Sequence, residues 1–435
     1  MKVAIVSLGC AKNLVDTENL LGILNASDQT IVFHYQDADA IIINTCGFIE
    51  SAKEEAIATI LDAAEYTKDT NKKLIVMGCL AKRYKSDLER EMPEVDRFIS
   101  IDEYDELGHI LSEVLGERII NDYGRTPRIL SGKPWMAYLK IAEGCDNRCS
   151  YCAIPLIRGP LHSYPIEDIV KEAKRLVLQG VKELNVISQD SSRYGYDWDQ
   201  KLHLSELLKQ LDAIEGVKWI RILYLYPDEI PDDLLDTIEN SQHILPYFDI
   251  PIQHGNRNML QRMHRRSNPE EIKERTSSIR KRFKNAVLRT TLITGFPQET
   301  IEEHIDNLNL LKEVEWDHLG VFTYSPEEDT PSFELENDIP EVEKERRRDE
   351  LMTAQSIIME ERRKSHIGEV MDVLVEEKDK LTGMYLGRSY LFAPDGVDGC
   401  IRFQSPEEIE LGAFVKVRIT KAMHADLIGT LEEKA

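Results

Sequence analysis

Three cysteines on one short segment are the strongest chemical signal in the sequence. Cys145, Cys149 and Cys152 form a C-x3-C-x2-C pattern, with Tyr151 directly before the last cysteine. Three thiolates on one loop can hold three irons of a cubane cluster and leave the fourth iron open for chemistry. Zinc is the alternative, with a fourth ligand such as His162. Structural zinc sites normally use two paired knuckles, so the spacing favours an iron-sulfur cluster.

Three further cysteines, Cys10, Cys46 and Cys79, each follow a short apolar run that predicts a buried strand. The carboxyl ends of parallel strands form one edge of an open α/β sheet, so residues far apart in sequence converge there. Each cysteine also adjoins a glycine, which suits tight turns and close backbone approach. A single free cysteine is usually a packing residue. Three at equivalent strand ends favour a shared metal site.

The elements that must position these cysteines begin with an N-terminal α/β domain, residues 1–128. Short β-branched runs alternate there with amphipathic stretches, which predicts a parallel sheet with helices on both faces. The expected strands are 3–8, 40–44, 73–77 and 97–100, and the expected helices lie near 13–25, 50–66, 81–91 and 104–115.

Residues 129–366 repeat this alternation over too long a stretch for the same small sheet, and they predict a partial or full (β/α) barrel. The C-x3-C-x2-C segment directly follows the first of its strands. The expected strands are 136–141, 183–188, 219–225, 247–250, 288–293 and 318–322. The expected outer helices lie near 166–179, 205–214, 228–239, 270–284 and 300–313.

Residues 367–435 change to short strands separated by turns, which predicts a small antiparallel β-barrel. The expected strands are 370–376, 381–386, 399–403, 414–419 and 426–430. From Glu369 onward there are 13 acidic and 8 basic residues, whereas a nucleic-acid-binding barrel is usually basic. Cys400, alone in this part, is expected to be a buried apolar residue.

Composition narrows the classes of protein that remain. The chain has 435 residues and a net charge of -24, with 42% hydrophobic and 30% charged residues, which excludes collagen-like and wholly disordered chains. No apolar stretch approaches the ~18 residues that span a bilayer, so we expect no membrane. An odd number of cysteines, 7, without a signal segment predicts reduced thiols in the cytoplasm.

The C-x3-C-x2-C segment with its aromatic residue resembles the radical S-adenosylmethionine (SAM) superfamily. The resemblance implies that Cys145, Cys149 and Cys152 bind a 4Fe-4S cluster whose open iron chelates SAM. Reductive cleavage of SAM then gives a 5′-deoxyadenosyl radical that removes a hydrogen atom from an unactivated carbon. Contacts to SAM are expected near the cluster and near strand ends of the barrel, from Tyr151, Glu183, Gln189, Gln253, Arg289 and Gly295. His254 has the simpler interpretation of a hydrogen-bonded core histidine.

With the three N-terminal cysteines added, the whole chain resembles the methylthiotransferase family and its RimO branch. The segments that carry this resemblance are SLGCAKNLVDTE (7–18), SQDSSRYG (188–195), LYLYP (223–227), YFDIPIQH (247–254) and FTYSPEE (322–328). The resemblance implies a TRAM-like terminal barrel and a second 4Fe-4S cluster on Cys10, Cys46 and Cys79. It also implies methylthiolation of the β-carbon of an aspartate in ribosomal small-subunit protein twelve, with a low-potential electron donor and a sulfur donor as partners.

Two loops depart from the family pattern. The family commonly has GFPGET and EEGT, whereas this chain has Gln298 and Asp329 at the loop glycines. Both residues adopt a positive φ less freely than glycine does. The departures put the geometry of the two loops in question rather than the chemistry.

Charge helps to choose among substrates. The acidic balance fits docking on a basic ribosomal protein and makes direct nucleic-acid binding, other than through the ribosome, a weaker expectation. Residues 257–284 hold 10 Lys and Arg against 3 Glu, which would fit a tRNA-adenosine methylthiotransferase instead. A non-catalytic iron-sulfur scaffold or redox sensor is the alternative of another class.

Overall fold

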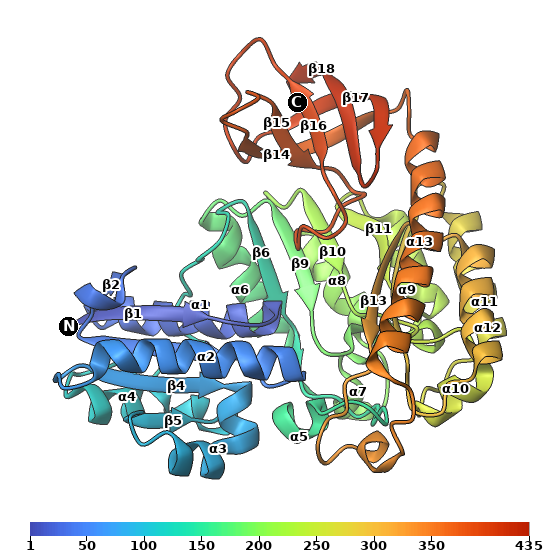
Figure 1. Cartoon of the computed structure of the whole chain (residues 1–435). Helices are drawn as coiled ribbons and strands as arrows, with labels where there is room; N and C mark the ends of the chain where they lie inside the picture. Colours follow the sequence, from blue (N-terminus) through green and yellow to red (C-terminus); the bar gives the residue numbers. More distant parts are fainter. Residues whose placement is uncertain (435) are drawn as a thin grey trace.

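The computed structural model describes residues 1–434, which form three parts in chain order (Figure 1). The N-terminal sheet has five parallel strands in the order β2-β1-β3-β4-β5. The four expected strands are confirmed as β1 (Lys2–Ser7), β3 (Ala40–Thr45), β4 (Lys73–Gly78) and β5 (Arg97–Ile99). The edge strand β2 (Thr30–Val32) was not expected, because its three residues are too few for a periodic signal.

Helices cover both faces of this sheet. They are α1 (Ala11–Ala26), α2 (Glu50–Thr67), α3 (Cys79–Glu91) and α4 (Leu107–Leu115), with the 3-10 turns η1 (Tyr35–Asp37) and η2 (Ile101–Glu106). Strand β3 is buried on both faces, and its alternate side chains enter two separate apolar clusters. This is why its sequence is an unbroken apolar run.

The central part is a six-stranded parallel sheet in the order β13-β12-β11-β10-β9-β6. The six strands match the six expected ones: β6 (Met136–Lys140), β9 (Glu183–Ile187), β10 (Trp219–Ile222), β11 (Ile244–Asp249), β12 (Val287–Thr294) and β13 (His318–Thr323). Within residues 1–434, β13 and β6 have one strand neighbour each, so the structure selects the partial barrel over the full one. A short hairpin of β7 (Ala142–Glu143) and β8 (His162–Ser163) follows β6.

The helices around the central sheet have clear sequence causes. α11 and α12 begin at the capping boxes Asn268/Glu271 and Thr300/Glu303. The longer helices are α6 (Ile166–Leu178), α8 (Leu204–Asp212), α9 (Asp232–Asn240), α11 (Pro269–Arg282), α12 (Ile301–Val314) and α13 (Glu341–Ser365). The short ones are α5 (Ile154–Arg158), α7 (Tyr196–Asp199), α10 (Arg257–Arg262), η3 (Ser191–Arg193), η4 (Pro227–Glu229) and η5 (Pro331–Glu334). Among the described residues, none of the helices is long and apolar enough to cross a bilayer.

The C-terminal part is a closed five-stranded barrel, as expected, but one of its pairs, β16 with β18, is parallel. Its strands are β14 (Val370–Lys378), β15 (Tyr385–Arg388), β16 (Ile401–Gln404), β17 (Phe414–Met423) and β18 (Asp426–Lys434). The strand expected at 381–386 begins later, because a turn closed by Asp379 and Met384 occupies its first half. Cys400 is partly exposed rather than buried, since it lies in the loop before β16.

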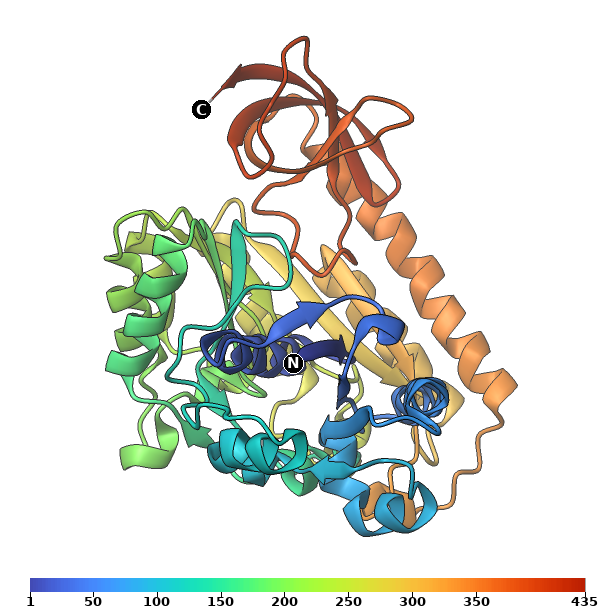
Figure 2. The same ribbon diagram turned by 90° about the vertical axis from the view of Figure 1, so that its left-hand side faces the viewer.

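The N-terminal part lies beside the β6 edge of the central sheet, and the terminal barrel lies beyond one end of the central strands (Figures 1 and 2). α1 packs against β6, the edge strand of the central sheet, while α13 runs beside β13 to the terminal barrel. Arg388 of the barrel reaches Glu183 at the start of β9, with Nη2 2.6 Å from Oε2, and Asp395 lies 2.6 Å from Arg289. The terminal barrel is therefore joined to the amino ends of the central strands through ion pairs, and the pair between Arg388 and Glu183 is buried.

Candidate functional site

The structure brings the three N-terminal cysteines to one edge of the first sheet. Cys10 precedes α1, Cys46 follows β3, and Cys79 begins α3 directly after β4. Strands β1, β3 and β4 are adjacent and parallel, so their carboxyl ends meet. Cys46 and Cys79 are buried, whereas Cys10 is exposed.

The turns that carry these cysteines approach so closely that side chains do not fit. A Cβ added to Gly9 would lie 2.7 Å from the Cβ of Cys46, and one added to Gly47 would lie 2.9 Å from the backbone of Leu80. Asn13 joins the turns, because its Nδ2 donates to the carbonyl of Thr45 at 2.9 Å. Packing thus requires glycine at these positions, and also at Gly78, where a Cβ would lie 2.4 Å from Asn44 Oδ1.

Arg158 connects this edge with the central part of the molecule. Its Nη2 lies 3.6 Å from the Sγ of Cys79 and donates to Asn13 Oδ1 at 2.7 Å. Asp16 and Glu143 balance its charge, at 3.0 Å and 2.8 Å. All of these side chains are largely buried, and Arg158 lies just after the second group of cysteines in the chain.

The second group lies on the loop between β7 and α5. A positive φ of 69° at Gly144 starts the loop, and a Cβ there would lie 1.9 Å from the carbonyl of Pro160. Asn147 donates to Cys145 Sγ at 3.4 Å and to Asp190 at 2.6 Å. Arg265 Nη1 lies 3.6 Å from Cys149 Sγ. Both cysteine groups therefore have one buried arginine donating to one thiol.

The ionisation of the thiols reflects their burial. Desolvation raises the pKa of Cys79 and that of Cys145 to about 12 and also raises the pKa of Cys46 and of Cys152. Within each group the negative charge of neighbouring cysteines also raises the pKa of Cys79 and of Cys152. Among residues 1–434, no three His, Cys, Asp or Glu side chains are placed so that they could together hold a metal ion. Thiols held on glycine turns, three of the six buried, nevertheless fit iron-sulfur ligation, in which metal displaces the thiol protons.

The segment 223–227 runs between the two cysteine groups. Tyr224 faces the N-terminal group, with the Nζ of Lys12 3.4 Å above its ring. Tyr226 faces the other group, with its hydroxyl 3.7 Å from Cys149 Sγ and the Arg265 guanidinium 3.9 Å from its ring. Tyr224 has a φ of 63°, a strained conformation that its backbone bonds to Ser191 and Asp249 fix.

The other residues expected to contact SAM separate into two sets. Glu183 and Arg289 are engaged with the terminal barrel and neighbouring strands, and the structure does not bring them to the cysteine loop. Tyr151 lies beside Cys149, and Gln189 has a buried Oε1 without a hydrogen-bond partner among the described residues. Gln253 has a φ of 73° and pairs with β12 through Leu292.

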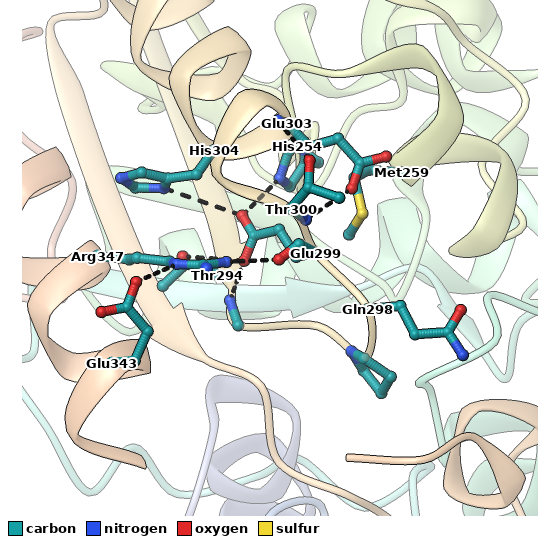
Figure 3. A network of polar contacts seen from close by, with 12 residues as sticks. His254, Met259, Thr294, Gln298, Glu299, Thr300, Glu303, His304, Glu343 and Arg347 are labelled. Carbon is teal, nitrogen blue, oxygen red and sulfur yellow. Dashed lines mark hydrogen bonds and ion pairs between the residues drawn. The ribbon is translucent and has the colours of Figure 1, made fainter. Parts of the chain in front are cut away.

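Gly295 begins a loop that a buried carboxylate organises (Figure 3). Glu299 accepts hydrogen bonds from the Gly295 amide, from His254 at 3.0 Å and from Arg347 of α13 at 3.0 Å. His254 is fully buried, which confirms it as a hydrogen-bonded core histidine. In this loop Gln298 has a φ of 63°, and Asp329 in the other departing loop has a φ of 62°. This chain thus keeps the glycine-like backbone at both positions.

Several residues that line the cysteine groups were not identified from the sequence. Lys12, Asn13 and Asp16 lie in the SLGCAKNLVDTE segment, so the motif carried the signal although no role was assigned to them. Arg158 and Arg265 had no such signal, because their partners come from distant parts of the chain. His162, considered as a zinc ligand, is exposed and packs edge-on against Tyr164.

The basic run 257–284 is mostly neutralised by acidic neighbours. Six of its seven arginines and one of its three lysines form ion pairs with nearby carboxylates. These pairs are Arg257–Glu270, Arg262–Glu303, Arg266–Asp228, Lys273–Glu313, Arg275–Asp232, Arg280–Asp317 and Arg282–Asp236. A surface paired in this way has little charge left for phosphates.

Comparisons with known proteins agree with this architecture. Residues 2–100 match the uncharacterized protein family UPF0004, residues 139–311 the radical SAM superfamily and residues 367–431 the TRAM domain. The radical SAM match implies a 4Fe-4S cluster and SAM. Among solved structures, the radical SAM methyltransferase TsrM from Kitasatospora setae is 10% identical with a TM-score of 0.55, over 76% of this chain and 73% of that chain. This likeness concerns the fold.

Curated relatives match over almost the full length. The ribosomal protein uS12 methylthiotransferase RimO of Clostridioides difficile (strain 630) is 44% identical over 99% of this chain and 98% of its own. The protein of the same name from Aquifex aeolicus (strain VF5) is 44% identical over 99% of this chain and 97% of its own. With the radical SAM match and the two cysteine groups, this identity shows that the chain belongs to the RimO family of radical SAM methylthiotransferases.

Proposed function

We propose that this protein adds a methylthio group to the β-carbon of an aspartate in ribosomal protein uS12. The observation that carries the proposal is the pair of cysteine groups on either side of the segment 223–227, each with a buried arginine at one thiol. Relatives of the same length and organisation are named uS12 methylthiotransferases. A ribosomal substrate is consistent with a cytoplasmic reaction.

We assign Cys145, Cys149 and Cys152 to the radical-generating 4Fe-4S cluster, and Cys10, Cys46 and Cys79 to a second 4Fe-4S cluster. When bound, the two clusters with SAM supply a 5′-deoxyadenosyl radical and the sulfur that the substrate radical accepts. The domains would be 1–128 for the second cluster, 129–366 for the radical chemistry and 367–435 for the TRAM-like barrel. A low-potential electron donor and a sulfur donor complete the partners.

The chain's own groups orient and shield this chemistry. The N–H groups of Arg158 and Arg265 donate to one sulfur in each cysteine group, which holds the thiol directions and favours their anionic form. Tyr151 and Tyr226 lie beside Cys149 and keep water from the loop. Tyr151, Gln189, Gln253 and Gly295 remain the candidate SAM contacts, and Gln189 has a buried acceptor free for a ligand.

Glu183 and Arg289 have a different role in this proposal. Glu183 is fully buried, and Arg221 and Arg388 hold its pKa below the ordinary value despite the cost of burial. The ion pair of Arg289 with Asp395 likewise crosses to the terminal barrel. Both residues would fix the barrel on the core rather than contact SAM.

The tRNA alternative is disfavoured by the ion pairs of the basic run 257–284 and by the acidic terminal barrel. The scaffold or redox-sensor alternative predicts no turnover of SAM. It is separated by reducing the reconstituted protein with SAM and measuring 5′-deoxyadenosine, which a scaffold would not form.

Mass spectrometry of uS12 and of bulk tRNA, from cells with and without the gene, tests the proposal. We expect the mass of one methylthio group to disappear from the uS12 aspartate alone when the gene is removed. Loss from a tRNA adenosine would overturn the substrate assignment while leaving both cluster assignments in place.

A further inference from the structure

Lys12 is a buried cation without a polar partner. It lies in the first turn of α1, two residues after Cys10, and only 7% of it is exposed. Its Nζ lies 3.4 Å above the ring of Tyr224. In the described part of the chain, every other lysine or arginine that is nine-tenths buried has a hydrogen bond or ion pair, whereas Lys12 has neither.

A buried ammonium group without a hydrogen-bonding partner is costly, because it has lost water and gained no anion. The contact with the Tyr224 ring recovers part of that cost. An arrangement of this kind is explained if an anion joins Lys12 when the enzyme works. The question is which anion.

The nearby carboxylates of the chain have other partners. Asp249 accepts a hydrogen bond from the Tyr224 amide at 3.1 Å and faces Arg289 at 3.8 Å. Glu143 is bound by Arg158 at 2.8 Å and by Lys140. Neither forms an ion pair with Lys12. The charge of Cys10, when ionised, also acts on Lys12, but this thiol is assigned to the second cluster, so a further anion comes from outside the chain.

We propose that Lys12 binds the side-chain carboxylate of the substrate aspartate and so selects aspartate over asparagine. The inference rests on the proposed function. The carboxylate carbon is bonded directly to the β-carbon, so the carboxylate lies beside the sulfur-delivering group whenever that carbon meets sulfur. Lys12 lies two residues after Cys10 of the N-terminal cysteine group. Its ammonium faces the segment 223–227, which separates the two cysteine groups.

Lys12 is thus a specificity-determining residue for the substrate. A buried cation rejects an uncharged amide because the amide leaves the charge unpaired. A hydrogen bond to a charged group corresponds to a preference of about 10- to 100-fold. We expect the cluster-loaded wild-type protein to bind uS12 with its aspartate that much more tightly than uS12 with asparagine at the same position.

The experiment compares Lys12→Gln, Lys12→Arg and the control Lys209→Gln, which removes the same charge from an exposed site on α8. Binding of both uS12 forms is measured by titration of the holoenzyme with SAM. Lys12→Gln should lose the preference for aspartate, whereas Lys12→Arg should keep part of it and Lys209→Gln all of it. Iron content and 5′-deoxyadenosine formation without uS12 are measured in all three variants, and the control Lys209→Gln should keep both at the wild-type level.

The inference is overturned if Lys12→Gln still prefers aspartate, or if it weakens binding of both uS12 forms equally. Loss of iron in Lys12→Gln would also overturn it, because Lys12 would then serve the second cluster. Failure of the proposed function looks different, since the wild-type protein itself would leave uS12 unmodified.

Discussion

The two cysteine groups reach similar surroundings by different routes. Cys145, Cys149 and Cys152 lie within eight residues on one loop, so local spacing brings them together. Cys10, Cys46 and Cys79 come from three strand ends, so these cysteines are brought together only by the pairing of β1, β3 and β4. In both groups, burial raises thiol pKa values and one buried arginine donates to one sulfur. The chemistry of a thiol site is thus set by its surroundings, whichever route assembles it.

The arginines also differ between the groups. Arg158 is held by the carboxylates of Asp16 and Glu143 and joins the first domain to the core. Arg265 stacks on Tyr226 and donates to the carbonyl of Pro251 at 2.8 Å. The first is part of a buried ion network, whereas the second depends on neutral partners.

The largest expected effect separates the functions of the two groups. Cys149→Ala should abolish formation of 5′-deoxyadenosine, because the radical cluster loses a ligand, and should leave about half of the iron. Cys46→Ala should keep that cleavage but stop insertion of sulfur. Iron analysis and chromatography of the nucleoside products check both. A methylthiolated product from the Cys46 variant would contradict the division of roles.

The second comparison replaces each buried arginine by methionine. Arg158→Met leaves Asp16 and Glu143 with an unbalanced buried charge, so it should lower the free energy of unfolding by about 3–5 kcal/mol. Arg265→Met removes hydrogen bonds to uncharged groups and should cost about 1–3 kcal/mol. Urea unfolding of the full chain measures both. Equal losses in the free energy of unfolding would contradict the expectation that the ion network around Arg158 makes its replacement more costly than that of Arg265.

The third comparison uses pH on the metal-free protein. Burial raises the pKa of Cys79 and that of Cys145 to about 12 from an ordinary 9.0. The unfolded chain therefore loses these protons first, and each thiol lowers the stability of the fold as pH rises from about 9 toward 12. Cys79→Ser and Cys145→Ser should each reduce the fall in the free energy of unfolding between pH 7 and pH 10, relative to the parent. An unchanged slope in one variant would show that its thiol ionises as freely as in the unfolded chain.

The smallest expected effect concerns the two departing loops. Gln298 is exposed, in the loop that Gly295 begins, whereas Asp329 lies two residues after Glu327, which binds Lys53 and Arg83 of the N-terminal part. Both residues have positive φ. Gln298→Gly should stabilise the protein by up to about 1 kcal/mol, while Asp329→Gly should change little because Asp tolerates this conformation better. Thermal unfolding checks this order, and a larger gain for Asp329→Gly would reverse it.

Much of the fold could be predicted from the sequence. Apolar periodicity identified the strands of the first two sheets except β2, and the turn-rich composition of the last part predicted its barrel. These features are local, because side-chain alternation and turn residues act over a few positions. The parallel β16–β18 pair and the partial closure of the central sheet depend on contacts between distant strands.

The sequence by itself determined the cysteine spacing, the strand ends and the glycines at the turns. Only the tertiary structure decided that Glu183 faces Arg388 rather than the cysteine loop, and that Arg158 reaches Cys79 from another domain. It also decided that the basic run is neutralised and that Lys12 is buried without a partner. The physical reason is that a charged side chain acquires its role from the groups that surround it after folding, and those groups are far away in the sequence.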